Sequence, residues 1–503
     1  MYFICYDFET TGRNSNWDQI IQVAAVLANE NLEEMDSFES SCFLKPGTIP
    51  EPGALMVNER IPGEETNLSH YELVKLMRRK FTDWVNTYSP VAFIGYNSVN
   101  FDEEFLRRTL YKNLFPPFLT TAHTFGVAGK RGDIINLART ANNFYPGTFK
   151  TTFNEKGREV YKLDQLARDN LVSGTGKKFK FHDALDDVKA TIEIAKIIKK
   201  KTPQLWNSAL RTMTKNDVIE FINQEEFVLS SEFNFGESRI YIVALICDNS
   251  KGTLKLFDLR NDPSQLIGLD YQELKKIINQ TSPKIIRSIR MNAHPILMTR
   301  EFIYSVVGYE NIGIEELNRR TQVLKENKEL SSQLKRLIFE EVEANEEKRA
   351  FDQADKEPEE SIYSFGFASP QEKNLMAKFH ASDWQEKLKI AYQFQNLRSN
   401  DHQSLQRGRI YSDFAKLIVF EENPGILSEV DRNHIKKKLA DRMFFHDTDT
   451  VKSPWNNIER AHLNIVDIAA ELSEKGEQKK IDFLYKIKDL IEDIENQFLN
   501  LKS

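Results

Sequence analysis

The sequence is poor in cysteine and contains no long apolar run. Its 503 residues include 3 cysteines, an odd number spread over Cys5, Cys42 and Cys247. This argues against a disulfide framework or a cysteine-based metal site, and we interpret the three as buried thiols. No apolar stretch reaches the roughly 18 residues that cross a bilayer, and Met1 is followed by apolar residues rather than by a basic leader. We therefore expect a cytoplasmic protein without membrane contact.

The chain also lacks low-complexity tracts and an excess of basic charge. Hydrophobic residues make up 40% and charged residues 28%, with a net charge of −7, which is typical of a soluble globular protein. The net charge argues against polyanion binding by the whole surface, although a cleft can be basic within an acidic protein. Lysines outnumber acids in one stretch, residues 177–201.

The first 201 residues predict an α/β domain. Residues 3–9, 20–28 and 37–44 are strand-like, and residues 72–88 have helical periodicity. A short apolar run at 91–96 predicts a buried strand, and helices are expected at about 101–111 and 183–199. Strands followed by strand–helix alternation indicate a layered α/β arrangement rather than a helical bundle.

The pattern changes after residue 201. Residues 239–247 and 253–259 flank a turn and predict a β-hairpin in a β-rich middle domain, 202–355. Residues 340–361 indicate a solvated helix end and a linker, and 356–503 predict a helical domain. The final helix carries an apolar stripe of Leu484, Ile487, Ile491, Ile494 and Phe498, which favours internal packing over an external partner helix.

Two acids stand in the first strand, where apolar residues are expected. Asp7 and Glu9 are two residues apart, so in an extended strand they point to the same face, about 7 Å apart along the chain. Two carboxylates on one face form half of a divalent cation site. A solvated strand end is the alternative, and the pair alone does not decide between them.

Two further segments carry candidate site residues. Asp102 follows the buried strand at 91–96 and falls in the first turn of a helix, where it either interacts with the helix dipole or serves a ligand at the sheet's carboxyl edge. His182 and Asp187 are five residues apart and cannot share a helical face. If Asp183 is the N-cap, His182 lies in the preceding loop and Asp187 in the first turn, an arrangement that suits a base and a ligand.

These segments resemble three motifs of the DEDDh exonuclease family. The motifs are DFETTG at 7–12, YNSVNFD at 96–102 and HDALDD at 182–187. Further segments, 52–62, 95–115, 131–139 and 182–196, are similar to a bacterial branch of this family that digests single-stranded DNA. The resemblance implies an RNase H-like exonuclease domain with a mixed sheet, then a β-rich Src-homology-like barrel domain and an α-helical C-terminal domain.

The resemblance also implies roles for the site residues. Asp7, Glu9 and Asp187 would hold the metal ion that binds the attacking water, Asp7 would bridge to a second ion, and Asp102 would support that ion. His182 would act as the general base. Oxygen ligands favour two Mg²⁺ ions, with Mn²⁺ as a substitute. We interpret Glu103 and Glu104 as caps or solvated helix residues and leave Asp133 without a role.

A single-strand path needs cations along the backbone and flat groups for stacking. The candidates are Thr10, Leu55 and Met56 around the 3′-terminal nucleotide, by analogy with the family, and Arg107, Arg108, Lys177, Lys178, Lys180, Arg287 and Arg290 along the backbone. The family precedent implies docking to the acidic C-terminal tail of a single-stranded DNA-binding protein, and we expect a monomer. An RNA-directed DEDDh exonuclease and a noncatalytic single-strand-binding module remain the alternative functions.

Overall fold

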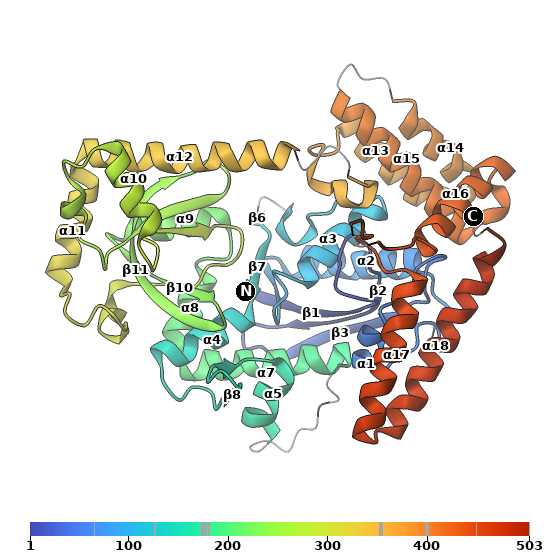
Figure 1. The fold of residues 1–503 in the computed structure, drawn as a ribbon, viewed down its shortest axis with the longest axis horizontal. Coiled ribbons are helices and arrows are strands. Elements are labelled where there is room, and N and C mark those ends of the chain that lie inside the picture. Colours follow the sequence, from blue (N-terminus) through green and yellow to red (C-terminus); the bar gives the residue numbers. More distant parts are fainter. Residues whose placement is uncertain are drawn as a thin grey trace.

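The structure is a computed structural model that describes residues 1–64, 66–124, 127–172, 179, 182–351, 356–397, 402–448 and 450–501. No helix among these residues is long and apolar enough to span a membrane. Figure 1 shows a first sheet in the middle of the molecule, a second sheet on one side and the C-terminal helices on the other. The division at residues 201 and 355 stays a prediction.

The first sheet is mixed, as the sequence predicted. Its order is β3-β2-β1-β4-β7. The strands are β1 (Tyr2–Thr10), β2 (Ile20–Ala28), β3 (Glu34–Ser41), β4 (Val91–Gly95) and β7 (Lys130–Asp133). β1 pairs antiparallel with β2 and parallel with β4, so β1 lies in the centre of the sheet.

The two faces of β1 pack in different cores because side chains alternate along a strand. Ile4, Tyr6 and Phe8 belong to a core with helices α2 (His70–Tyr88) and α3 (Asp102–Lys112). Phe3 and Cys5 belong to a second core with α4 (Ile134–Phe144) and α7 (Ala184–Lys201). Asp7 and Glu9 continue the row of Phe3 and Cys5, so their strand positions face the α7 side.

The second sheet is antiparallel and shares its core with the first. Its order is β13-β12-β11-β10-β14. The strands are β10 (Val228–Asn234), β11 (Glu237–Asp248), β12 (Thr253–Asp258), β13 (Ile286–Arg290) and β14 (Leu297–Met298). β11 and β12 form the predicted hairpin. One continuous core runs from Phe3 of β1 to Leu337 of the long helix α12 (Lys328–Phe351), so the two sheets are packed together.

The C-terminal helices pack on two other parts of the first sheet's domain. They are α13 (Pro370–Ala381), α14 (Trp384–Gln395), α15 (His402–Glu422), α16 (Glu429–Met443), α17 (Ile458–Lys475) and α18 (Gln478–Phe498). Tyr71 of α2 lies in the core of α13–α15, and Leu55 of α1 (Pro52–Asn58) lies in the core of α17 and α18. The predicted stripe of α18 is buried in this second core, which confirms internal packing.

Two of the three cysteines are buried, as predicted. Cys5 and Cys42 are fully covered, and burial raises the pKa of each thiol above its ordinary value. Cys247 is only half-buried because it lies near the end of β11, so the prediction was wrong for this residue.

Two buried, neutral histidines, His294 and His380, connect later parts of the chain to the first sheet's domain. The backbone N–H of Asp133 donates to Nδ1 of His294 at 3.0 Å, and Nε2 of His294 lies 3.0 Å from the carbonyl of Ala209. His380 of α13 stacks on Phe115 with ring centroids 3.7 Å apart and lies 3.1 Å from the carbonyl of Leu114. Burial lowers the pKa of both histidines to about 4.

We predict a loss of stability in mild acid from these histidines. In the unfolded chain each imidazole has a pKa of about 6.5, whereas in the folded chain it has a pKa of about 4. Between these two pH values the unfolded state binds more protons than the folded state, so the free energy of unfolding decreases as pH falls from about 6.5 to about 4. The free energy of unfolding of the native protein and of the double variant His294→Gln, His380→Gln should converge as pH falls from 7 to 4. A constant difference between the two urea midpoints across this range would contradict the prediction.

Candidate active site

Three carboxylates converge between β1 and α7. Ligand oxygens of Asp7, Glu9 and Asp187 all lie within 4.8 Å of one another. The reason is the packing of β1, because the Cys5 thiol donates to the carbonyl of Val188 at 3.7 Å and so places the first turn of α7 beside the strand. Glu9 is buried, and Asp7 and Asp187 are half-buried. The predicted placement of two strand acids on one face is therefore present in the fold.

Asp102 contacts β1 from helix α3, which lies on the face of the sheet opposite α7. It is the first residue of α3 and is buried, and its Oδ1 accepts a hydrogen bond of 3.1 Å from the backbone N–H of Phe8. Phe8 stands between Asp7 and Glu9, so this contact fixes Asp102 against the strand position that separates the two acids. Asp133 caps α4 and accepts from the N–H groups of Asn97 and Val99, which holds the loop that leads into α3.

The segment before α7 has the predicted cap. Asp183 is the N-cap and accepts from the N–H of Asp186, which places Asp187 in the first turn. His182 lies just before the helix with a positive φ of 66°, and its side chain is exposed. Its backbone N–H donates to Oδ2 of Asp187 at 3.3 Å. An ion pair of 2.5 Å between Arg60 and Asp183, which sequence reasoning missed, ties this cap to the chain after α1.

Burial, together with repulsion between neighbouring carboxylates, raises the pKa values of these four side chains. Burial raises the pKa of Asp187 to about 7 and that of Asp102 to about 8. The pKa values of Asp7 and Glu9 are also raised, first by burial and then by neighbouring carboxylates. Four acids that repel one another in a partly dry site are stabilised in their charged form by a cation.

The residues fit a divalent cation. Oδ1 of Asp187 is buried and has no hydrogen-bond partner among the described residues, so it is free to act as a ligand. The converging donors are carboxylate oxygens, which suit hard cations such as Mg²⁺ or Mn²⁺ rather than zinc. The arrangement is therefore an acidic cluster that fits a divalent cation, with a histidine beside it.

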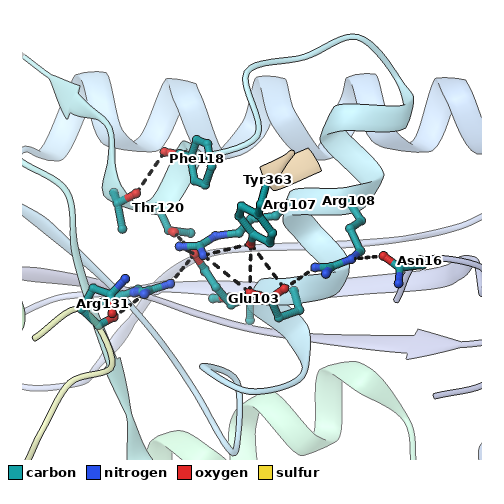
Figure 2. Close-up of polar contacts among 12 residues, drawn as sticks. Asn16, Glu103, Arg107, Arg108, Phe118, Thr120, Arg131 and Tyr363 are labelled. Carbon is teal, nitrogen blue, oxygen red and sulfur yellow. Dashed lines mark hydrogen bonds and ion pairs between the residues drawn. The ribbon is translucent and has the colours of Figure 1, made fainter. Parts of the chain in front are cut away.

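A buried ion-pair network surrounds Glu103, the residue that follows Asp102 in α3 (Figure 2). Glu103 accepts from the hydroxyl of Tyr6 at 3.1 Å and forms ion pairs of 2.8 Å with Arg107 and 2.7 Å with Arg131. Tyr6 and Phe8 flank Asp7, so the first two residues of α3 hold β1 on both sides of this acid. The interpretation of Glu103 as a cap or solvated residue was wrong, because it is only 1% exposed. Sequence gave no signal for its partners on other elements.

We predict that Glu103→Ala costs about 3–5 kcal/mol of unfolding free energy, because it leaves the buried Arg131 without its carboxylate and Arg107 with only a 3.6 Å contact to Glu104. Glu104→Ala is the matched control. Glu104 pairs with Arg108 at the partly exposed edge of the network, so its loss should cost about 1 kcal/mol or less. Urea unfolding measures both values, and equal effects would show that Glu103 is no more structural than its neighbour.

The predicted nucleic-acid contacts fall into three groups. Arg107 and Arg287 are buried in ion pairs, the latter with Glu232 and over the ring of Tyr241, which gives them a structural role. Arg290 is exposed at the end of β13, and Arg108 is half-buried beside Asn16. Lys177, Lys178 and Lys180 lie outside the described residues.

The three residues expected around a terminal nucleotide are largely covered. Thr10 is buried and its hydroxyl donates to the carbonyl of Gly12 at 2.7 Å. Leu55 is fully buried under α17 and α18, and Met56 is half-buried against the same core. The Met56 side chain is therefore accessible to a nucleotide, whereas that of Leu55 is not.

A pocket of about 600 Å³ opens beside Glu9. One wall consists of residues 8–18 and α1, and the other comes from the C-terminal segment, which contributes Trp455, Asn456, Arg460 and Asn464. Asn464 accepts from the N–H of Gly53 at 3.2 Å, and Asn14 donates to the carbonyl of Pro454 at 2.9 Å. Sequence reasoning assigned no role to this segment because nothing local links it to residue 9.

Comparison with known proteins agrees with this geometry. Residues 4–195 match a family model described as exonuclease. The exodeoxyribonuclease I of Buchnera aphidicola subsp. Acyrthosiphon pisum is 27% identical over 349 residues, which is 65% of this chain and 79% of that protein.

Solved structures share the fold over nearly the whole chain. An exonuclease I from Methylocaldum szegediense superposes with a TM-score of 0.74 at 19% identity, covering 98% of this chain and 99% of that one. Escherichia coli exonuclease I in complex with a dA16 oligonucleotide superposes with a TM-score of 0.71 at 18% identity and the same coverage.

Residues 4–195, which contain the mixed sheet and its acidic site, match the exonuclease family model. The curated sequence match extends beyond that domain. The chain is similar to bacterial exodeoxyribonuclease I, and these matches indicate that it is an enzyme.

Proposed function

We propose that this protein hydrolyses single-stranded DNA from its 3′ end and releases nucleoside 5′-monophosphates. The observation that carries the proposal is the convergence of Asp7, Glu9 and Asp187 beside a pocket large enough for a nucleotide. The names of the related proteins support the substrate class, since the matched relatives are exodeoxyribonucleases and the E. coli structure holds a DNA oligonucleotide.

We infer the following roles for the chain's own residues. Asp7, Glu9 and Asp187 would hold one divalent cation, and Asp7 and Asp102 would help to hold a second. Bound divalent ions supply charge neutralisation at the phosphate and activate the attacking water. His182, exposed beside Asp187, would accept the proton from that water, because an imidazole is the side chain that most often serves as a general base.

Mg²⁺ as the ion and a cytoplasmic monomer as the working form belong to the same proposal. Docking to a single-stranded DNA-binding protein is supported by a solved structure of this fold that is named for SSB and exonuclease I. No residue of this chain is assigned to that dock.

The test uses purified protein with Mg²⁺ on three substrates of the same sequence: single-stranded DNA, duplex DNA and RNA, each labelled at the 5′ end. A descending ladder on single-stranded DNA that EDTA abolishes supports the proposal. Preference for RNA favours the exoribonuclease alternative. Binding without cleavage, in Mg²⁺ or Mn²⁺, would leave a noncatalytic single-strand-binding module.

A further inference from the structure

Three aromatic rings form an exposed cluster where the C-terminal segment returns to α3. Phe118 precedes the first domain's short 3-10 turn at Leu119–Thr121, and Tyr363 ends the turn at Pro358–Tyr363. The Phe118 ring lies 5.6 Å from that of Phe367 and 6.3 Å from that of Tyr363. Phe367 is 77% exposed and Tyr363 is 51% exposed. Neighbouring aromatic rings with this exposure mark an interaction surface.

Two guanidinium groups lie against two of the rings, those of Phe118 and Tyr363 (Figure 2). The guanidinium of Arg107 lies 5.2 Å from the Phe118 ring centroid, and that of Arg108 lies 5.5 Å from the Tyr363 ring centroid. Tyr363 also donates to Glu104 at 3.2 Å, which orients its ring on α3. Arg107, Arg108 and Arg131 pair with Glu103 and Glu104 in the surrounding network, and the guanidinium groups of Arg107 and Arg108 also lie against these rings. An anionic partner with flat groups fits this surface.

The cluster stands close to the cation site along the helix. Arg107 and Arg108 follow Asp102 by five and six residues on α3, which at 1.5 Å per residue is roughly 8–9 Å of helix. Arg108 also donates to Asn16, whose neighbour Trp17 lines the pocket beside Glu9. Helix α3 therefore connects Asp102, which contacts β1, with the two arginines that lie against these rings.

We propose that Phe118, Tyr363 and Phe367 form a base-stacking platform for single-stranded nucleic acid on its way to the carboxylate site. Stacking on exposed rings is tolerant of sequence, and it combines with nearby guanidinium groups in single-strand binding. The inference rests on the proposed function, since the strand that stacks here is the substrate of the same site. The proposal gives α3 and residues 358–367 a shared role in binding the single-stranded nucleic acid.

Binding without cleavage tests the platform. Fluorescein-labelled dT20 is titrated in EDTA with the native protein and with the double variant Tyr363→Ala, Phe367→Ala. The platform predicts a Kd at least tenfold higher for the double variant. Tyr363→Phe keeps the ring and loses only the hydroxyl, so it should bind within twofold of the native protein. Tyr304→Ala and Phe235→Ala remove other exposed rings, 87% and 89% exposed, and serve as matched controls.

Photocrosslinking locates the contact. Oligonucleotides with 5-iododeoxyuridine at successive positions from the 3′ end should crosslink to Tyr363 or Phe367 at one or two adjacent positions. If the native protein cleaves and binds DNA while the double variant binds within twofold of it, the platform is refuted and the proposed function stands. If the native protein neither binds nor cleaves single-stranded DNA, the proposed function itself fails.

Discussion

Asp187→Asn should abolish nuclease activity while leaving the metal-free protein at least as stable as before. The loss should exceed about 100-fold, because substitutions of residues that merely support a metal ligand already cost 10- to 100-fold in affinity or activity. Stability should rise because burial raises the pKa of Asp187 to about 7, so at pH 8 its charge opposes folding when no cation is present. The site is thus expected to trade stability for function.

The measurement is a single-turnover rate in Mg²⁺ together with the thermal midpoint in EDTA at pH 8. Asp186→Asn is the matched control, since it removes an acid from the same turn of α7 without touching the converging set. Loss of activity accompanied by a lower thermal midpoint would assign Asp187 a structural role instead.

His182→Asn should lower the rate of hydrolysis by about 10²–10⁴-fold and leave Mn²⁺ binding unchanged. The imidazole is exposed and lies outside the group of converging carboxylates, so its removal should affect proton transfer rather than the cation site.

Rates are measured under single-turnover conditions from pH 5.5 to 8.5, and Mn²⁺ binding is followed by electron paramagnetic resonance. His446→Asn, which removes another exposed histidine, is the control and should behave like the native protein. If His182→Asn loses Mn²⁺ binding together with activity, the histidine is a ligand and not a base.

Local patterns were sufficient to predict the central elements of the fold and the placement of the acids. The period of two in β1 placed Asp7 and Glu9 on one face, and the Asp183 cap fixed where α7 begins. These features depend on residues close in sequence, so a strand or cap pattern determines them. The roles of His182 and of the four carboxylates in catalysis stay a prediction.

Long-range contacts account for what the sequence did not predict. Glu103, Arg107 and Arg287 look like solvated charges in the sequence, yet each finds a buried partner. A charge buried in an ion pair has the same local pattern as one in water, so only the fold separates them. Leu55 is similar, since α17 and α18 cover it from more than 400 residues away in the chain.

The direction and product of hydrolysis test the account most directly. Single-stranded DNA carrying a radiolabel in the 3′-terminal nucleotide is compared with the same strand labelled in the 5′-terminal nucleotide, in Mg²⁺ and with DNA in excess. The account predicts that the 3′ label appears at once as a nucleoside 5′-monophosphate, while the 5′ label stays in long fragments until late. Early release of the 5′ label, or internal fragments from either substrate, would contradict it.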